Sequence, residues 1–367
     1  MVLSAQDTSM SGCFDGFAII GIEGELNVRF LFMGIVIACG LLCAGGGSVA
    51  QTSLADFYRG KTVRIFIGFG PGGSSSLYAE ILARYMGRHL PGNPTVIAQH
   101  MPGAGGLVVA NYIAQRAPRD GTEFAIAART VAFEPQLGNK NAAFDPLKLG
   151  WVGNANVESS TCISWGSSPV QTAEDLFNHE LVVGGTSGES LAITMPRALN
   201  QLSNTKFRIV AGDTVSTDIL IAMERGELSG FCSIGWTFLK LRKPDWLRER
   251  KINILFQLAL ERHPELPDVP LALDLVKDPV GRQVLELLLA PQEMGRPFFA
   301  PPGLPAERLA ALRSAFQKTL GDSDYLRDAE KAGVEVQYTS GEAVQSLLER
   351  AYASSSEVVK RASALLQ

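Results

Sequence analysis

The chain has 367 residues, of which 46% are hydrophobic and 19% are charged, a composition typical of a globular protein. Lysine and arginine total 33 against 37 aspartates and glutamates, with no basic run, so charge argues against a nucleic-acid-binding protein. The length exceeds the usual size of one compact domain, and we therefore expect two lobes.

Residues 1–50 are interpreted as an N-terminal extension followed by a secretory signal. Arg29 precedes an apolar run over residues 30–42, and small residues follow that run. The run is shorter than the roughly 20 residues that a bilayer-spanning helix needs. We expect cleavage near Gln51 and Sec-dependent export to the periplasm. An uncleaved anchor helix and a lipoprotein attached at Cys39 are the alternatives.

Strands and helices alternate through the next part of the chain. Short β-branched or apolar runs predict strands at 63–67, 95–99 and 123–128, and apolar residues at helical spacing predict helices around 77–86 and over 107–117. Glycine-rich turns follow the first two strands. Strand, turn and helix in this order predict a parallel sheet whose carboxyl edge carries the turns.

The same pattern restarts after residues 151–154. Strands are predicted at 181–183 and 207–210, and helices from Leu191, kinked at Pro196, and up to Glu224. From residue 296 the chain predicts a strand and three helices that pack back on the first lobe. The predicted fold class is α/β, with lobe 1 formed by 51–153 with 296–367 and lobe 2 by 154–295, each a mostly parallel sheet flanked by helices.

Nucleotide-binding and catalytic motifs fail in this chain. Gly68, Gly70 and Gly73 satisfy G-x-G-x-x-G, but no acidic residue ends the second strand, and Ser74 stands where a phosphate loop has lysine. The glycines of residues 185–188 are in the wrong register for a serine nucleophile. The four histidines show no metal-ligand spacing. We therefore expect no cofactor, no metal and no enzymatic activity.

The four predicted turns instead favour recognition of an anion by backbone N–H groups at helix starts. Ser74, Ser75 and Ser76 are expected to cap the first of these helices. The turns contain no lysine or arginine, and Arg129 is the nearest basic residue. We therefore expect a ligand with one or two carboxylates, with an apolar body against Phe69 or Trp236, rather than citrate. The candidate ligand-binding residues are Phe69, Gly72, Gly73, Ser74, Ser75, Ser76, Ala104, Gly105, Thr130, Gly185, Thr186, Ser187, Asp213, Thr214 and Trp236.

Cys162 and Cys232 are the only cysteines after the predicted leader. In an oxidising compartment two such residues form a disulfide or remain two separate buried thiols, and the sequence leaves both alternatives open.

Five ordered motifs resemble one family. The segments "FYRGKTVRIFIGFGPGGSSS", "NPTVIAQHMPGAGG", "APRDGT", "PDVP" and "FFAPPGLPAERLAALRSAF" are similar to those of the substrate-binding receptors of tripartite tricarboxylate transporters, the Bug proteins. The resemblance implies a type II periplasmic-binding-protein fold that closes by a hinge over a carboxylate and delivers it to membrane permease subunits.

We expect a monomer. A receptor that presents ligand to a membrane signalling protein is the alternative function. One departure concerns Ser76, because the family usually has aspartate there and that residue ordinarily lines the pocket. Glu80 also stands where arginine or another residue is common. The ligand specificity of the family is therefore not carried over to this chain.

Overall fold

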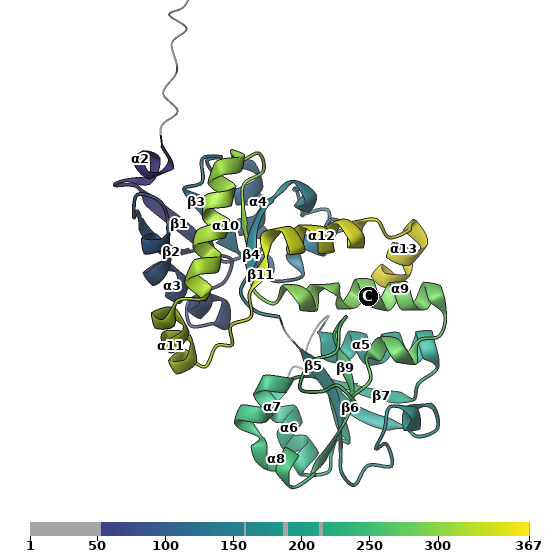
Figure 1. Cartoon of the computed structure of the whole chain (residues 1–367). Coiled ribbons are helices and arrows are strands. Elements are labelled where there is room, and N and C mark those ends of the chain that lie inside the picture. The colour runs from purple at the N-terminus through teal and green to yellow at the C-terminus, as the bar shows by residue number, and fades with distance from the viewer. Residues whose placement is uncertain (1–52, 158, 186–189, 213–215, 367) are drawn as a thin grey trace, which may run out of the picture. The chain divides into compact units, whose positions relative to one another are not determined.

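The computed structural model describes residues 53–366 except 158, 186–189 and 213–215 (Figure 1). The predicted signal, its cleavage site and Cys39 lie outside the described residues. Within the described part of the chain, no helix combines the length and apolar character needed to cross a membrane.

The first sheet combines strands from both ends of the described chain, in the order β11-β4-β10-β3-β1-β2. β1 pairs in parallel with β2 and β3, whereas β10 runs antiparallel between β3 and β4, and β11 is antiparallel to β4. Its strands are β1 (Thr62–Ile67), β2 (Thr95–His100), β3 (Glu123–Ile126), β4 (Gly150–Asn154), β10 (Pro297–Ala300) and β11 (Thr339–Ser340).

Helices from both ends of the chain cover this sheet. They are α2 (Leu54–Tyr58), α3 (Ser74–Met86), α4 (Leu107–Gln115), α10 (Ala306–Leu320), α11 (Ser323–Ala332) and α12 (Gly341–Tyr352). α3 buries the apolar face that its sequence predicts, including Tyr78, Ile81 and Leu82, in a core shared with Phe298 and Phe316. Burial of these apolar side chains is the main source of stability here.

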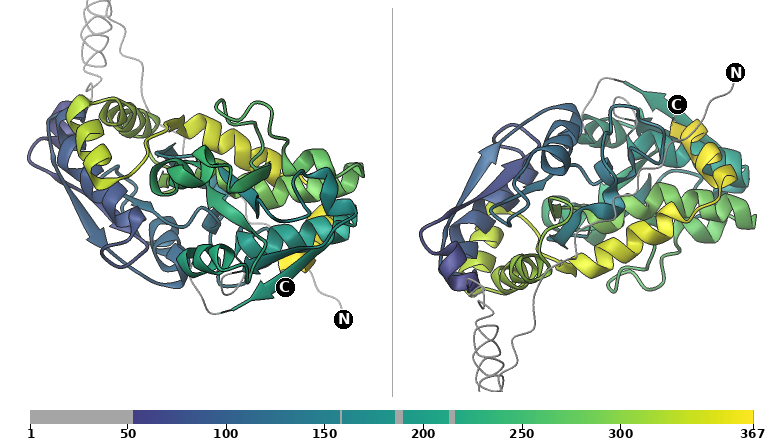
Figure 2. Two further views of the ribbon diagram at one scale, coloured as in Figure 1. Left: turned by 90° about the horizontal axis from the view of Figure 1, so that it is seen from below. Right: turned by 90° about the horizontal axis from the view of Figure 1, so that it is seen from above.

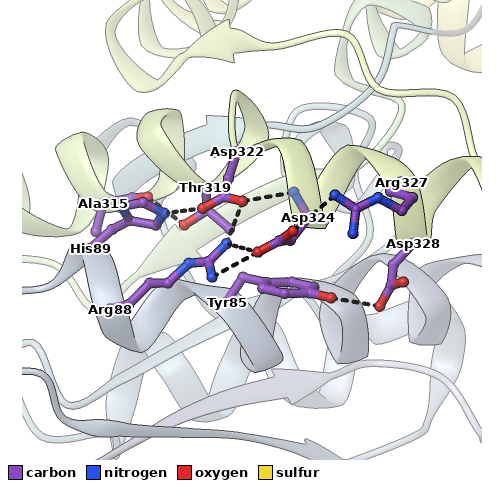
Figure 3. A network of polar contacts seen from close by, with 9 residues as sticks. All are labelled: Tyr85, Arg88, His89, Ala315, Thr319, Asp322, Asp324, Arg327 and Asp328. Carbon is purple, nitrogen blue, oxygen red and sulfur yellow. Dashed lines mark hydrogen bonds and ion pairs between the residues drawn. The ribbon is translucent and has the colours of Figure 1, made fainter.

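A polar network also fastens α3 to α11 (Figure 3). The Asp322 carboxylate lies 2.8 Å from His89 Nε2, contacts Arg88 and accepts a hydrogen bond from the Asp324 backbone N–H. Burial raises the pKa of Asp322, but these hydrogen bonds and the Arg88 charge outweigh it and hold the pKa at about 2. Nearby, the Tyr85 hydroxyl donates to the Asp328 carboxylate at 2.7 Å.

The second sheet has the order β7-β6-β8-β5-β9. β6 is parallel to β7 and β8, and β5 is antiparallel to β8 and β9. A disulfide between Cys162 and Cys232 joins the neighbouring strands β5 and β8. The strands are β5 (Ser160–Trp165), β6 (Leu181–Gly185), β7 (Phe207–Ala211), β8 (Gly230–Gly235) and β9 (Ile252–Leu258).

The second sheet is flanked by α5 (Leu191–Ser203), α6 (Ser216–Glu224), α7 (Trp236–Arg242), α8 (Pro244–Arg248) and α9 (Pro279–Leu289). Pro196 lies inside α5, as expected. Short 3₁₀ turns connect the elements at η1 (Gly87–His89), η2 (Ala104–Gly106), η3 (Val131–Phe133), η4 (Pro146–Lys148), η5 (Glu174–Phe177), η6 (Ala272–Leu275) and η7 (Ala290–Met294). The predicted fold class, α/β with two helix-flanked sheets, is confirmed. The sheets are mixed rather than mostly parallel as expected, because β10, β11 and β5 pair in the antiparallel direction.

The C-terminal part differs from the expectation. From residue 296 the described chain contains two strands and four helices, and the last helix, α13 (Ser356–Leu366), packs on α9 and α5 rather than on the first sheet (Figures 1 and 2). α13 buries Val358, Ala362 and Leu365. The apolar face of a helix shows that it needs a partner but does not identify the partner, so the sequence pattern could not reveal this docking.

Candidate ligand-binding site

The predicted turns of the first sheet meet at one edge because three parallel strands end level with one another. Ile67 at the end of β1 is paired with both His100 of β2 and Ile126 of β3. β10 is antiparallel to these strands, so its first residue, Pro297, starts at the edge where they end. Arg296, which precedes β10, therefore lies at the same edge as the glycine turns.

The first glycine turn combines one packed glycine with three open ones. A Cβ on Gly68 would lie 2.6 Å from the Cα of Gly106, so no side chain fits there. A Cβ on Gly70, Gly72 or Gly73 would have no neighbour within 4 Å. Gly72 also has a φ of 86°, which glycine adopts without strain. This turn therefore leaves its backbone accessible to a ligand.

The expected capping role of Ser74, Ser75 and Ser76 is wrong. Gly73 is the N-cap of α3, it makes no side-chain cap, and the three serines are the first helical residues. Helical side chains tilt back toward the N-terminus, which explains the contact that Ser76 makes instead. Ser76 is fully buried, and its hydroxyl donates to the Gly70 carbonyl at 2.8 Å. Ser76 thus braces the first glycine turn.

The second glycine turn has positive φ at four successive residues, Gly103, Ala104, Gly105 and Gly106. A Cβ on Gly106 would meet the Ala127 Cβ at 2.7 Å, whereas Gly105 has only the Ala128 Cβ nearby, at 3.9 Å. The Gly105 carbonyl accepts the Ala128 N–H at 3.1 Å. This bond ties the turn to the end of β3, and Ala104 and Gly105 remain exposed.

Phe69 and Thr130 lie at the same edge in different surroundings. The Phe69 side chain is partly buried against the core of the first sheet, and its carbonyl lies 2.9 Å from His100 Nδ1. The other ring nitrogen of His100 lies 3.6 Å from the Glu80 carboxylate. Thr130 is exposed immediately before η3. His100 therefore links the first turn to both β2 and α3.

On the second sheet, Thr186, Ser187, Asp213 and Thr214 lie outside the described residues. Gly185 is buried, and a Cβ there would lie 2.4 Å from Ile193 Cγ1, so its described role is close packing. Trp236 begins α7, where its indole N–H donates to Glu265 at 2.6 Å.

A cavity of about 330 Å³ brings parts of both sheets together. From the first-sheet side it is lined by Ser74, Tyr78 and Arg296, and from the second-sheet side by Gly235, Trp236 and Thr237. Of the predicted ligand-binding residues, Ser74 and Trp236 line this cavity. A larger cavity of about 630 Å³ between α9 and α12 is lined by none of them.

Arg296 is one of three charged residues of this cavity, with Arg242 and Glu335, that were not predicted from the sequence. Its guanidinium donates to the Ser74 hydroxyl at 2.9 Å and to the Gly295 carbonyl at 2.5 Å, and it lies 5.4 Å from the centre of the Tyr78 ring. No local sequence signal identifies Arg296, because its position depends on the antiparallel pairing of β10 with β3 and β4.

The chain crosses between the sheets next to Arg296. The buried Asn154 side chain accepts the Arg296 N–H at 2.7 Å and donates to the carbonyls of Asn156 and Glu293. Burial raises the pKa of the Glu293 carboxyl, which the Leu260 N–H partly offsets. Asn154 therefore joins the two crossing segments, 154–156 and 293–296.

No protein-family model matches the chain. A curated relative, the "UPF0065 protein in gbd 5'region" of Cupriavidus necator, is 23% identical over 310 residues, covering 83% of this chain and 89% of the relative.

Several solved structures share the fold of the chain. A TctC solute-binding protein from Polaromonas has a TM-score of 0.65 at 16% identity, covering 83% of this chain and 99% of that protein. A Rhodopseudomonas palustris protein with adipate has a TM-score of 0.53 at 19% identity, covering 82% and 97%. MatC from the same organism, with bound malate, has a TM-score of 0.50 at 21% identity, covering 84% and 99%. The chain therefore has the two-lobed fold of the TctC and Bug solute-binding proteins, the fold that its sequence motifs predicted.

Proposed function

We propose that this protein is an extracytoplasmic solute receptor without catalytic activity. It binds a small organic carboxylate between the two sheets and delivers it to a tripartite tricarboxylate-type membrane transporter. The observation that carries the proposal is the meeting of two glycine turns with accessible backbone at one sheet edge. Backbone N–H groups in such turns and at helix starts bind carboxylates without a metal.

The neighbouring structures support this choice of ligand. Adipate and malate, which the two R. palustris proteins carry, are both dicarboxylates. We propose the same class for this chain, with lobe 1 formed by 51–153 and 296–367 and lobe 2 by 154–295. The strands of the two sheets fall within these ranges, except that β4 of the first sheet extends one residue beyond its range, to Asn154. We further propose that the protein is exported, processed near Gln51 and monomeric.

A thermal-shift screen of the chain from Gln51 onward tests the proposal. Adipate, malate, citrate and straight-chain monocarboxylates are compared with the corresponding neutral amides at equal concentration. We expect acids with one or two carboxylates to raise the melting temperature and the amides to leave it unchanged, since a ligand that binds only the folded state stabilises it. Calorimetry then gives the affinities. If no acid shifts the melting temperature, the proposed function is wrong.

Transport itself is tested in cells. Deleting the gene is expected to abolish uptake of the radiolabelled acid that binds best, and the full-length gene is expected to restore it. Unchanged uptake in the deletion strain would contradict the transport role while leaving the binding role standing.

A further inference from the structure

We propose that Arg296 is the residue that receives the ligand carboxylate, and that the ligand class is a straight-chain acid whose hydrocarbon body packs on α7. This inference rests on the proposed function, and it replaces the expected recognition by backbone alone with recognition that includes one fixed arginine. The cavity of about 330 Å³ carries the argument, since it contains both the arginine and an apolar wall.

Among the described residues, three groups contact the guanidinium. Nη1 donates to the Gly295 carbonyl, Nη2 donates to the Ser74 hydroxyl, and the Tyr78 ring lies beneath the charge at 5.4 Å. The Tyr78 hydroxyl donates to the Glu335 carbonyl, which fixes the ring in turn. A guanidinium held in this way is prepared to bind a planar carboxylate without further loss of side-chain freedom.

The backbone of Arg296 is equally constrained. Its N–H donates to the side chain of the fully buried Asn154, and its carbonyl accepts the Ala155 N–H at 3.0 Å. Both bonds join the two crossing segments. Arg296 thus lies at the base of the space between the sheets, beside the first turn of α3.

The rest of the cavity has an apolar wall next to polar and charged residues that include Arg242 and His263. Phe238 and Leu241 of α7 line it and are 39% and 68% exposed, and Val157 and Val334 line it too. Covering these groups with a hydrocarbon chain is favourable by about 25 cal/mol per Å² of apolar surface removed from water. A ligand that is charged along its whole length would leave this contribution unused.

Charged groups of both signs line the cavity: Arg242 and Arg296 are the basic ones, and one acidic group bears on the charge of the ligand. Glu335 also lines the cavity, where its carboxylate accepts the Thr237 hydroxyl at 2.6 Å. A tricarboxylate would bring extra negative charge toward Glu335, which costs free energy in a partly enclosed site. The cavity therefore fits a carboxylate group at Arg296 followed by an unbranched hydrocarbon chain, as in hexanoate or adipate.

Calorimetric titration with hexanoate, adipate and hexanamide tests the proposal on the chain from Gln51 onward. Arg296→Gln removes the charge and is expected to weaken binding of both acids at least about tenfold, the size of a lost charge-assisted hydrogen-bond pair. Arg296→Lys keeps the charge without the planar fork and is expected to fall between wild type and Arg296→Gln. Arg116→Gln, an exposed residue at the C-terminal end of α4 and outside the cavity lining, is the control and is expected to change affinity less than twofold.

Two readouts separate a lost ligand contact from general damage. Wild-type affinity for hexanoate is expected to fall with rising salt concentration, and Arg296→Gln is expected to lose this dependence. The melting temperature without ligand reports whether the fold survives, and if Arg296→Gln does not fold, Arg296→Lys carries the test alone.

The possible failures are distinguishable. If the wild type binds none of the screened acids, the proposed function fails. If the wild type binds hexanoate or adipate and Arg296→Gln binds the same acids equally well, only the role of Arg296 is overturned. If Arg296→Gln does not fold, the same conclusion is drawn from Arg296→Lys. Tighter binding of citrate than of adipate would overturn the proposed ligand class.

Discussion

At the scale of single residues, Ser76 connects the start of α3 to the first glycine turn. Its buried hydroxyl donates to the Gly70 carbonyl, so Ser76→Ala leaves that carbonyl without this donor. We expect a loss of about 1 kcal/mol in the free energy of unfolding, the usual net value of such a bond, together with weaker acid binding. Urea denaturation and calorimetry measure the two effects.

Ser75→Ala is the matched control for this substitution, because it removes the neighbouring hydroxyl, which is less buried. Equal losses in the two variants would contradict a bracing role for Ser76. Aspartate at position 76 is expected to be worse than alanine, since an ionised carboxylate cannot donate to the Gly70 carbonyl.

Asp322 gives the fold a defined acid sensitivity. Its pKa falls from 3.8 in the unfolded chain to about 2, because the lowering by hydrogen bonds from His89, Asp324 and Arg88 exceeds the raising by burial. A lowered carboxyl pKa stabilises the fold above pH 3.8, and this contribution is lost as the pH falls toward 2. We expect Asp322→Asn to lower the melting temperature at pH 7 and to reduce its fall between pH 4 and 2.

Thermal unfolding followed by circular dichroism across this pH range provides the measurement. Asn substitution of the exposed Asp268 is the control and is expected to leave the pH profile unchanged. An Asp322→Asn profile parallel to wild type would argue against the network in Figure 3 as a source of stability.

At the scale of elements, the two adjacent glycines of the second turn have different constraints. Gly106→Ala places a Cβ 2.7 Å from Ala127 Cβ at a φ of 98°, so we expect a large loss of stability. In Gly105→Ala the new Cβ lies 3.9 Å from its nearest atom. We expect this variant to lose only about 1–2 kcal/mol in the free energy of unfolding, the penalty for alanine in a left-handed conformation.

Because there is space beside Gly105, the variant Gly105→Leu tests whether the ligand approaches the backbone of this turn. The variant is expected to remain folded while binding no acid, because its side chain occupies the exposed side of the turn. Denaturation establishes the fold and calorimetry the binding. Wild-type affinity in Gly105→Leu would show that the ligand does not approach this turn.

The β-turn-α units were predictable because their signals are local. β1, β2 and β7 begin or end within a residue or two of the predicted limits, since a β-branched run followed by glycine is visible in a short window. The insertion of β10 between β3 and β4 was not predictable in this way. That pairing joins residues about 150 positions apart, and no local pattern specifies it.

The distinction between local signals and long-range pairing also applies to the candidate site. The glycine turns were found from the sequence, whereas Arg296 enters the site only through the placement of β10. The role of Ser76 was misassigned for a different reason. A serine near a helix start can cap the helix or bond to a preceding turn, and the choice depends on the backbone of Gly73.

At the scale of the whole molecule, the disulfide constrains a long section of chain. Cys162 and Cys232 are 70 residues apart, and cross-linking at this separation stabilises a fold by at most about 4 kcal/mol through the unfolded chain. We expect the wild type to unfold at lower urea concentration after full reduction. The Cys162→Ala/Cys232→Ala variant is the control, and its urea unfolding should not respond to reductant. An unchanged midpoint of urea unfolding in the reduced wild type would contradict a stabilising disulfide.

Ligand binding is also expected to change the dimensions of the protein. A ligand that contacts both sheets favours the conformation in which both contacts are made. Small-angle X-ray scattering should therefore give a smaller radius of gyration with saturating acid than without it. The Arg296→Gln variant at the same acid concentration serves as the control. No compaction of the wild type at saturation would count against hinge closure.

The strand order has a consequence for the synthesis of the chain. All five strands of the second sheet come from residues 160–258, so that sheet has all its strands as soon as this segment emerges. β4 pairs only with β10 and β11 among the described strands, and these emerge last. A chain delivered from its N-terminus therefore holds the first sheet unfinished, with the facing edges of β3 and β4 unpaired, until β10 at residues 297–300 arrives. During that interval these edges are open to chaperones and to aggregation.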